Sequence, residues 1–377
     1  MKKIILLFTL ILLICSVFAG GAAAEGKYGI KYAEKFDIEY YENNIKVVTD
    51  SAGKKFLLVP EKAAVPEKLA AQKELTLVRT PVKRILCGST TYVSYLRKLD
   101  KSKKIYDSIT AVFNDEKDWT EKEIISRLKS GAIRCYPLTS GQKPDAEKIM
   151  TLAPDVIFST ELISSMSSIE PQLRSTGTVS VSVDEYLETS DYGSIEWLKF
   201  FGAFYNMDRE ADELFNEVYT YLEGMKAKIK KLRKDGRITP VTVAFGSYTR
   251  GVLYTVSGNS TFTRMMENAG GVYTLRDEKQ NGVVPVSMEA FLNRCRDADV
   301  FIYKGSIRYM PDKKALIAQN PLFGEFKAFK NNNIYVFAED FYINSAEIKE
   351  KFEDVVCILH PELMPGHRLK HYIRLGD

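Results

Sequence analysis

Tyrosine and arginine gather after two predicted strands in the second half of this chain. Tyr248 and Arg250 follow one of these strands, and Tyr303 and Arg308 follow the other. Arginine's planar fork pairs with carboxylates or with an anionic chelate, and tyrosine offers a flat apolar face with a hydroxyl group. A ligand of an open α/β sheet lies beyond the carboxyl ends of its strands, so these side chains predict a small-molecule site.

The first half of the chain adds aromatic candidates by the same rule. Tyr92 follows a strand predicted at 84–88, Tyr136 ends one predicted at 132–136, and Trp119 lies in the less regular stretch between them. Any single tyrosine among the 21 in the chain could equally be a core or surface residue. The side chains predicted to bind ligand are Tyr92, Trp119, Tyr136, Tyr248, Arg250, Tyr303 and Arg308.

The histidines argue against a bare metal site and a hydrolase triad. The chain has three, His360, His367 and His371, and all lie in its last 18 residues. A zinc centre would need histidines from both halves of a cleft, and a triad needs one as its base. His367 and His371 could share a metal if they were helical, but we predict a solvated tail. We therefore predict no catalytic residue, no metal ligand and no intrinsic cofactor.

Other features narrow the class of protein. The chain contains no Gly-x-Ser-x-Gly elbow and no phosphate-binding loop, although an exported enzyme acting on the cell envelope and an adhesion module remain alternatives. A net charge of +4 with 49 acidic side chains is too balanced for a nucleic-acid reader.

The first residues predict export. Lys2-Lys3, an apolar run at 4–18 and small residues at 19–24 form the three regions of a signal peptide, so mature protein is expected to begin near Glu25. Lipid attachment at Cys15 is an alternative, which we place second because Ile14 is bulkier than a lipoprotein peptidase prefers. Outside the cytoplasm the remaining cysteines could pair or stay free, and the sequence does not fix which. They are Cys87, Cys135, Cys295 and Cys357.

A repeated phrase indicates two lobes built on one plan. Pro144–Glu147 opens a short helical pattern before a strand at 155–159, and Pro285–Glu289 does the same before one at 299–304. In each copy a capping residue, Asp145 or Ser287, stands two places before a glutamate.

The elements between these repeats predict an α/β fold. After a hairpin at 37–60 and an irregular connector at 61–80, short strands alternate with helices, which is typical of a parallel sheet with helices on both faces. The first lobe is expected to hold strands at 84–88, 105–109, 132–136, 155–159 and 178–183, and helices at 90–98, 121–130, 145–153 and 166–175. The second is expected to hold elements at 240–246, 260–269, 287–296, 299–304, 334–337 and 345–359.

The predicted domains follow from this order. A signal peptide at 1–24 precedes an N-terminal lobe at 25–190, an interdomain helix and a following helix at 191–234, and a C-terminal lobe at 235–377. Because helices rather than a Gly/Ser linker join the lobes, we expect a rigid connection and only small closure.

An ordered set of short phrases covering most of the mature chain resembles the substrate-binding proteins of iron-complex and cobalamin ABC importers. The phrases are Val47–Lys54, Val82–Leu86, Pro144–Ile149, Ala153–Ile157, Glu267–Gly271, Val286–Phe291, Asn320–Phe323 and Ile358–Glu362. The stretches 61–80 and 113–130 depart from the family pattern.

This resemblance implies a monomeric, helix-linked, two-lobe protein outside the cytoplasm that delivers a metal chelate to a membrane permease dimer. The family includes ferric siderophore, haem and corrinoid binders, which the shared phrases do not separate; we predict a ferric siderophore as the transported ligand, with haem or a corrinoid as alternatives. Glu147 and Glu289 match the family's paired glutamates, which contact arginines on the two permease subunits. The alternative is that both glutamates serve only to stabilise the N-terminus of a helix through its dipole.

Overall fold

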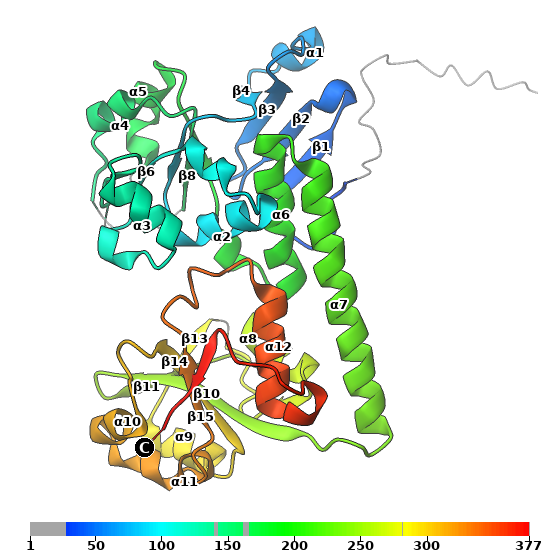
Figure 1. The fold of residues 1–377 in the computed structure, drawn as a ribbon, viewed down its shortest axis with the longest axis vertical. Coiled ribbons are helices and arrows are strands. Elements are labelled where there is room, and N and C mark those ends of the chain that lie inside the picture. Colours follow the sequence, from blue (N-terminus) through cyan, green and yellow to red (C-terminus); the bar gives the residue numbers. More distant parts are fainter. Residues whose placement is uncertain (1–27, 139–141, 161–165, 281, 377) are drawn as a thin grey trace, which may run out of the picture.

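Two lobes and one long helix make up the molecule in a computed structural model that describes residues 28–138, 142–160, 166–280 and 282–376. The N-terminal lobe lies at the top of Figure 1, the C-terminal lobe lies below it, and helix α7 runs along both. The predicted signal peptide falls outside the described residues.

The N-terminal lobe is built on a five-stranded sheet in the order β7-β6-β5-β8-β9, with every pairing parallel. Its strands are β5 (Ile85–Cys87), β6 (Ile109–Val112), β7 (Arg134–Cys135), β8 (Val156–Ser159) and β9 (Val179–Ser182). Its helices are α2 (Thr90–Leu99), α3 (Lys122–Lys129), α4 (Ala146–Leu152) and α5 (Glu170–Arg174). The strand predicted at 105–109 is instead a 3-10 turn that leads into β6, because the buried apolar run begins only at Ile109.

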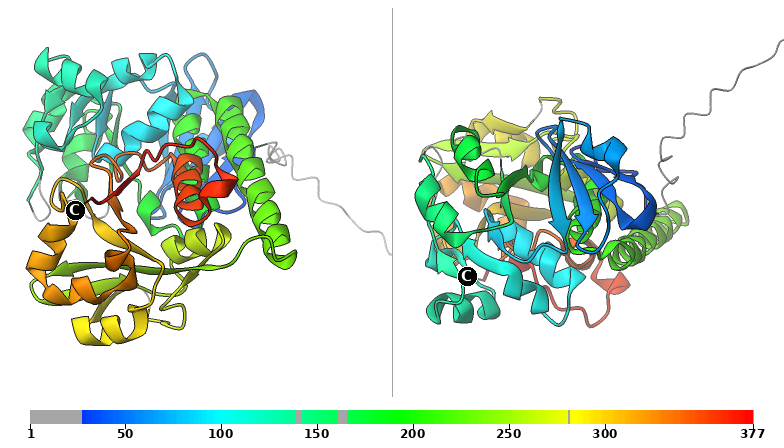
Figure 2. Two further views of the ribbon diagram at one scale, coloured as in Figure 1. Left: turned by 60° about the horizontal axis from the view of Figure 1, so that its bottom comes forward. Right: turned by 90° about the horizontal axis from the view of Figure 1, so that it is seen from above.

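A second sheet of four strands precedes this one in the sequence. Its order is β1-β2-β3-β4, and it stands beside α7 when the molecule is seen from above (Figure 2). The strands are β1 (Asp37–Tyr40), β2 (Lys46–Thr49), β3 (Lys55–Pro60) and β4 (Leu75–Thr80). The hairpin prediction is confirmed, but the irregular connector predicted at 61–80 is wrong. It contains α1 (Glu67–Ala70) and β4, an edge strand parallel to β3 that keeps Leu77 exposed and so lacks a clear apolar alternation.

Helix α6 (Asp191–Tyr205) belongs to the N-terminal lobe, whereas α7 (Asp208–Lys234) runs along both lobes. Twelve of the fifteen α6 residues are buried, and its aromatic rings pack on the first lobe's core, for example Phe204 on Phe158 at 5.1 Å between ring centroids. The prediction that 191–206 is interdomain is therefore wrong. A helix that is apolar around most of its surface must be covered on all sides.

The C-terminal lobe has a mixed sheet in the order β13-β11-β10-β14-β15-β16, with β12 beside β10. Strands β10, β12, β14 and β15 run parallel, and β11, β13 and β16 are antiparallel to their neighbours. The strands are β10 (Val241–Thr249), β11 (Val252–Val256), β12 (Gly271–Tyr273), β13 (Val283–Val286), β14 (Val300–Ser306), β15 (Ile334–Phe337) and β16 (Tyr372–Arg374). The helices are α8 (Thr261–Asn268), α9 (Met288–Cys295), α10 (Lys313–Gln319), α11 (Lys327–Lys330) and α12 (Ile348–Leu359).

The repeated phrase forms the same unit in both lobes. Asp145 Oδ1 accepts the Lys148 N–H at 3.2 Å at the start of α4, and Ser287 Oγ accepts the Ala290 N–H at 3.1 Å at the start of α9. The aspartates before the two strands also share a role: Asp155 accepts backbone N–H groups at 83 and 84, and Asp299 accepts the one at 242. Each aspartate thus ties its own strand to the beginning of the neighbouring one.

The C-terminal tail is part of the core, so the solvated tail predicted from sequence is wrong. Strand β16 pairs with β15, and Asp354, which is fully buried, accepts the backbone N–H groups of Lys370 and His371. His367 Nε2 lies 2.6 Å from the other Asp354 oxygen. A buried carboxylate needs such partners, and here the tail supplies them.

Candidate functional site

A hollow opens at the carboxyl ends of two central strands of the C-terminal lobe, β10 and β14. Its volume is about 620 Å³, inside the roughly 300–1,000 Å³ range of small-ligand pockets. The lining residues are Ser247, Tyr248, Thr249, Arg250, Gly251, Tyr303, Lys304, Gly305, Tyr309, Met310 and Gln319. Three of the predicted ligand residues, Tyr248, Arg250 and Tyr303, are therefore brought together here.

The tyrosines of the hollow hold one another in place. Tyr303 is 4% exposed, and its hydroxyl accepts the Tyr248 N–H at 3.2 Å and donates to the Tyr248 carbonyl at 3.1 Å. Tyr248 is half-buried, its hydroxyl accepts from Asn320 Nδ2 at 3.0 Å, and its ring meets Phe323 edge-on. Tyr303 thus fixes the backbone of Tyr248, and the ring of Tyr248 lines the hollow in a fixed position.

Cations occupy the rim of the hollow. Arg250 and Gly251 form the two-residue turn of the β10–β11 hairpin, where Thr249 pairs with Val252. Both turn residues have positive φ, 52° and 84°, as this type of tight hairpin turn requires. The turn leaves Arg250 exposed, whereas Lys304 is half-buried and burial lowers its pKa. No carboxylate is among the described residues that line the hollow, so its charge favours an anion.

Arg308 lies outside the lining of the hollow. Its side chain is 48% exposed, and Nη1 is 3.5 Å from Glu339 Oε1 on the segment after β15. The neighbouring Tyr309 is 71% exposed and does line the hollow. The stretch after β14 therefore serves the site, but through Tyr309 more directly than through Arg308.

Two candidates of the N-terminal lobe are core residues. Tyr92 is 1% exposed, and its hydroxyl donates to the Val183 carbonyl at 2.7 Å. Trp119 is 4% exposed, and its indole N–H finds no partner among the described residues. Neither side chain is accessible to a ligand, so these two predictions are wrong. Tyr92 falls on the inner face of α2, which a rule based on strand ends alone cannot distinguish from the outer face.

Tyr136 has an intermediate position. It is half-buried beside Phe113, and its hydroxyl accepts the Asp145 N–H at 3.1 Å, so it helps to fix the start of α4. Applied to the strands predicted at 132–136 and 155–159, the rule that ligands lie past strand ends also selects Thr139, Ser140 and Glu161, which lie outside the described residues.

Exposed aromatic residues after two other strands were missed. Tyr186 follows β9 and is 51% exposed, and Tyr342 follows β15 and is 53% exposed. Both strands were predicted, so extending the search by a few residues past each strand end would have found them. The buried acids Asp184 and Glu185 also follow β9, in the N-terminal lobe. Asp184 accepts hydroxyl hydrogen bonds from Ser51 at 2.6 Å and Thr160 at 2.7 Å, and burial raises the pKa of Glu185 to about 7.

The histidines and cysteines have structural positions. His360 and His371 are each 2% exposed, and within the described part of the chain no three His, Cys, Asp or Glu side chains gather as a metal site would require. Cys87, Cys135, Cys295 and Cys357 are free thiols, and of these four Cys135 is the exposed one. Burial raises the pKa of Cys87 to about 12, so that thiol is unreactive.

Glu147 and Glu289 are exposed in the first turns of α4 and α9, as predicted. Neither carboxylate makes a hydrogen bond or an ion pair with another described residue, which leaves both free for a partner.

Residues 85–340 match the model of the periplasmic binding protein family, so the chain belongs to that family. An uncharacterized lipoprotein of Methanocaldococcus jannaschii is 27% identical, over 92% of this chain and 85% of the relative. A TroA-like periplasmic binding protein, FepB, of Veillonella parvula has a similar solved structure with TM-score 0.58, 16% identity and coverage of 79% and 96%. A periplasmic heme binding protein of Pseudomonas aeruginosa has TM-score 0.55, 13% identity and coverage of 77% and 95%.

Family membership makes this chain a binding protein and not an enzyme, which removes the exported-enzyme alternative. It also agrees with the resemblance recognised in the sequence and with the two-lobe α/β architecture joined by a long helix. Over the described residues, no helix is long and apolar enough to cross a membrane.

Proposed function

We propose that this protein captures an anionic iron chelate, a ferric siderophore, in the cleft between its lobes and delivers it to an ABC importer. The observation that carries the proposal is the hollow of about 620 Å³ at the ends of β10 and β14, where tyrosines and cations meet without a carboxylate in the lining. Family membership supports an extracytoplasmic binding role and an importer as the kind of partner.

The chemistry of the hollow favours a chelate with aromatic, negatively charged arms. Tyr248 and Tyr309 offer ring faces, and Arg250 and Lys304 offer positive charge. Lys304 is half-buried and burial lowers its pKa, so an anion beside it would favour its charged form.

Haem is the second candidate ligand, because a heme binding protein shares the fold and because the hollow contains Tyr309 and Met310. A corrinoid is a third, and being neutral it would gain less from Arg250 and Lys304. The visible absorption spectrum of protein purified from its native host distinguishes the three, since ferric catecholate, haem and corrinoid differ in colour. A haem or corrinoid spectrum would overturn the siderophore assignment.

Titration of arginine variants tests the position of the site. Charge-assisted hydrogen bonds are worth roughly 1.5–3 kcal/mol each, so Arg250→Ala with Arg308→Ala should weaken binding of a ferric tris-catecholate by several kcal/mol. A neutral corrinoid should bind both proteins alike. Arg233→Ala with Arg237→Ala is the matched control, because these exposed arginines lie at and just beyond the far end of α7. Unchanged affinity in the first variant would remove the arginines from the site.

We further propose that Glu147 and Glu289 dock the two lobes onto the two halves of a permease dimer. A two-fold permease presents the same surface twice, so a protein with a repeated unit can offer one acidic anchor in each lobe. Glu147→Arg with Glu289→Arg should abolish uptake while chelate binding by the purified protein persists. Glu67→Arg with Glu325→Arg, at other exposed glutamates of the two lobes, controls for the change in net charge.

The mode of attachment can be tested by mass. A signal peptide cleaved before Glu25 gives a protein without lipid, whereas the lipoprotein name of a relative supports processing at Cys15. The intact mass of native protein separates a start at Glu25 from a diacylated start at Cys15.

A further inference from the structure

Residues 338–347, called here the interlobe loop, leave the carboxyl end of β15 and reach the N-terminal lobe before α12 begins. In Figure 1 this orange segment rises from the lower lobe to the level of α2. The two lobes are therefore joined along α7 and also touch through this loop, in addition to the contact in which Thr261 and Arg264 of α8 donate to the carbonyls of Glu188 and Thr189.

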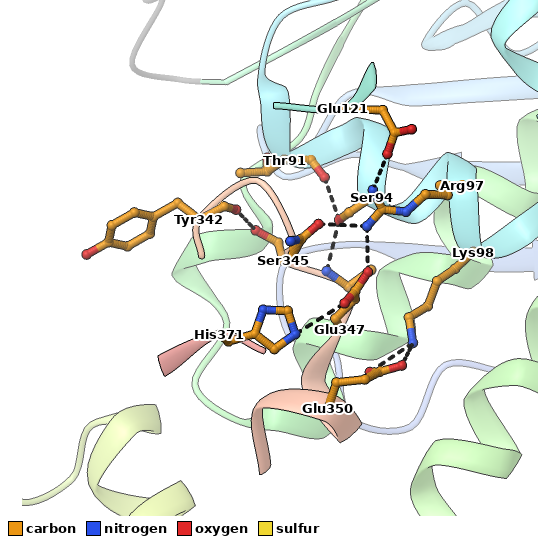
Figure 3. Close-up of polar contacts among 12 residues, drawn as sticks. Thr91, Ser94, Arg97, Lys98, Glu121, Tyr342, Ser345, Glu347, Glu350 and His371 are labelled. Atoms are coloured by element: carbon orange, nitrogen blue, oxygen red, sulfur yellow. Dashed lines mark hydrogen bonds and ion pairs between the residues drawn. The ribbon is translucent and has the colours of Figure 1, made fainter. Parts of the chain in front are cut away.

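The N-terminal-lobe end of the loop is buried and densely hydrogen-bonded (Figure 3). The Ala346 N–H donates to Ser94 Oγ at 2.9 Å, and both residues are fully buried. Arg97 Nη2 donates to Asn344 Oδ1 at 2.7 Å and to Glu347 Oε1 at 2.5 Å. Three residues of the loop thus hold one face of α2.

Charged groups around this contact reinforce it. Glu350 at the start of α12 pairs with Lys98 of α2 at 3.0 Å, and His371 Nε2 lies 3.2 Å from Glu347 Oε2. Burial opposes ionisation of Glu347, but His371 and the Arg97 guanidinium together hold its pKa at about 2. Glu347 therefore stays ionised through the physiological range, so its pair with Arg97 keeps its charge at neutral pH.

The other end of the loop contacts the segment after β14, whose Tyr309 lines the candidate site. Glu339 is the residue whose carboxylate pairs with Arg308, and both side chains are about half exposed. Tyr342 is exposed and points away from the Arg97 cluster in Figure 3. The exposed pair of Glu339 and Arg308 at 3.5 Å is weak, whereas Arg97 and Glu347 are each 21% exposed and are held by several partners. The Glu339 end can therefore change partners while the Glu347 end stays docked.

We infer that the interlobe loop positions the two lobes for ligand binding, and that Glu339 competes with an anionic ligand for Arg308. The inference rests on the proposed function in one respect, that the ligand is anionic. It assigns two separate roles: Arg97 and Glu347 are positioning residues that fix the lobe orientation, and Glu339 tunes affinity.

The positioning role can be measured without ligand. Electron double resonance reports the distance between the lobes when one spin label is attached to each. The labels are placed at the exposed positions Lys148→Cys on α4 and Ala290→Cys on α9. Cys135→Ser and Cys357→Ser remove the two native thiols that are not buried. Arg97→Met and Glu347→Gln should each broaden the distance distribution, and the double variant should add little. Arg127→Met is the matched control, because Arg127 pairs with Asp107 and Glu123 inside one lobe and is similarly exposed. A distribution in Arg97→Met identical to that of the unchanged protein would overturn the positioning role.

The tuning role is measured by titration with a ferric tris-catecholate. Glu339→Gln should tighten binding by roughly two- to five-fold, the range expected for an exposed ion pair, and should lose this effect when Arg308→Ala is present. Binding that is unchanged or weaker in Glu339→Gln would overturn the competition. If the unchanged protein does not bind the probe at all, the siderophore proposal fails, while the distance measurement still decides the positioning role.

Discussion

Tyr92 in the N-terminal lobe and Tyr309 in the C-terminal lobe both follow, by a few residues, a strand that is parallel to its neighbours. Yet the first is 1% exposed and the second 71% exposed. Tyr92 lies on α2 and packs against Phe201 of α6, with 5.7 Å between ring centroids. Tyr309 lies in a turn before α10 and lines the hollow. The end of a strand therefore predicts which part of the lobe a residue lies in. The element that follows the strand decides whether its side chain enters the core or the candidate site.

The charged groups at the carboxyl ends of the strands also differ between the two lobes. The N-terminal edge holds the buried acids Asp184 and Glu185, whereas the C-terminal edge presents Arg250 and Lys304. The cations of the candidate site thus come from the C-terminal lobe, whereas these two acids of the N-terminal lobe are buried. This difference predicts that ligand affinity depends mainly on the C-terminal lobe.

Removal of the buried tyrosine should have the largest effect. Tyr92→Ala should lower the free energy of unfolding by about 3–5 kcal/mol, because it empties a filled position in the core. Urea denaturation measures this loss, and Tyr92→Phe should recover all but about 1 kcal/mol, the value of the hydrogen bond to the Val183 carbonyl. A loss below 1 kcal/mol in Tyr92→Ala would mean that the site is less tightly packed than the structure shows.

The stabilisation that Glu347 provides at the contact between the lobes should depend on pH. The pKa of Glu347 falls from 4.5 to about 2 on folding, so its stabilising contribution is complete above pH 4.5 and disappears as the pH falls toward 2. That shift corresponds to about 3 kcal/mol at neutral pH. Glu347→Gln should be less stable than the unchanged protein at pH 7 and equal to it near pH 2, measured by denaturation across that range. Parallel pH profiles for the two proteins would contradict this expectation.

Asp191, at the start of α6, should give stability the opposite dependence on pH. Burial raises its pKa from 3.8 to about 6, and its Oδ1 has no hydrogen-bond partner among the described residues. Stability is therefore lost as the pH rises from 3.8 through 6, and Asp191→Asn should stabilise the protein at pH 7 by roughly 1–3 kcal/mol. The gain should vanish at pH 3.5, and a gain that persists there would point to packing instead of charge.

Removal of the exposed tyrosine should have the smallest effect on stability. Tyr309→Ala should change the free energy of unfolding by no more than about 0.5 kcal/mol, as exposed substitutions usually do. Its affinity for a ferric tris-catecholate should nevertheless fall, measured by fluorescence titration. If stability fell by several kcal/mol, the contrast between the two tyrosines would be lost.

The sequence was enough to predict the two-lobe α/β plan, the repeated helix and strand, and the caps Asp145 and Ser287, because these depend on local periodicity and on side chains bonding to nearby backbone. It also led to Tyr248, Arg250 and Tyr303 as neighbours, since parallel strands bring their carboxyl ends to one edge.

Only the tertiary structure decided the remaining features. Whether Tyr92 faces the core, whether α6 is covered on all sides, and whether the tail with His367 and His371 is buried depend on contacts between segments far apart in the chain. The same holds for the contact of Arg97 with Glu347, 250 residues away. Local propensity fixes which elements form, but burial and pairing are set by the packing of those elements, and no short stretch of sequence records that packing.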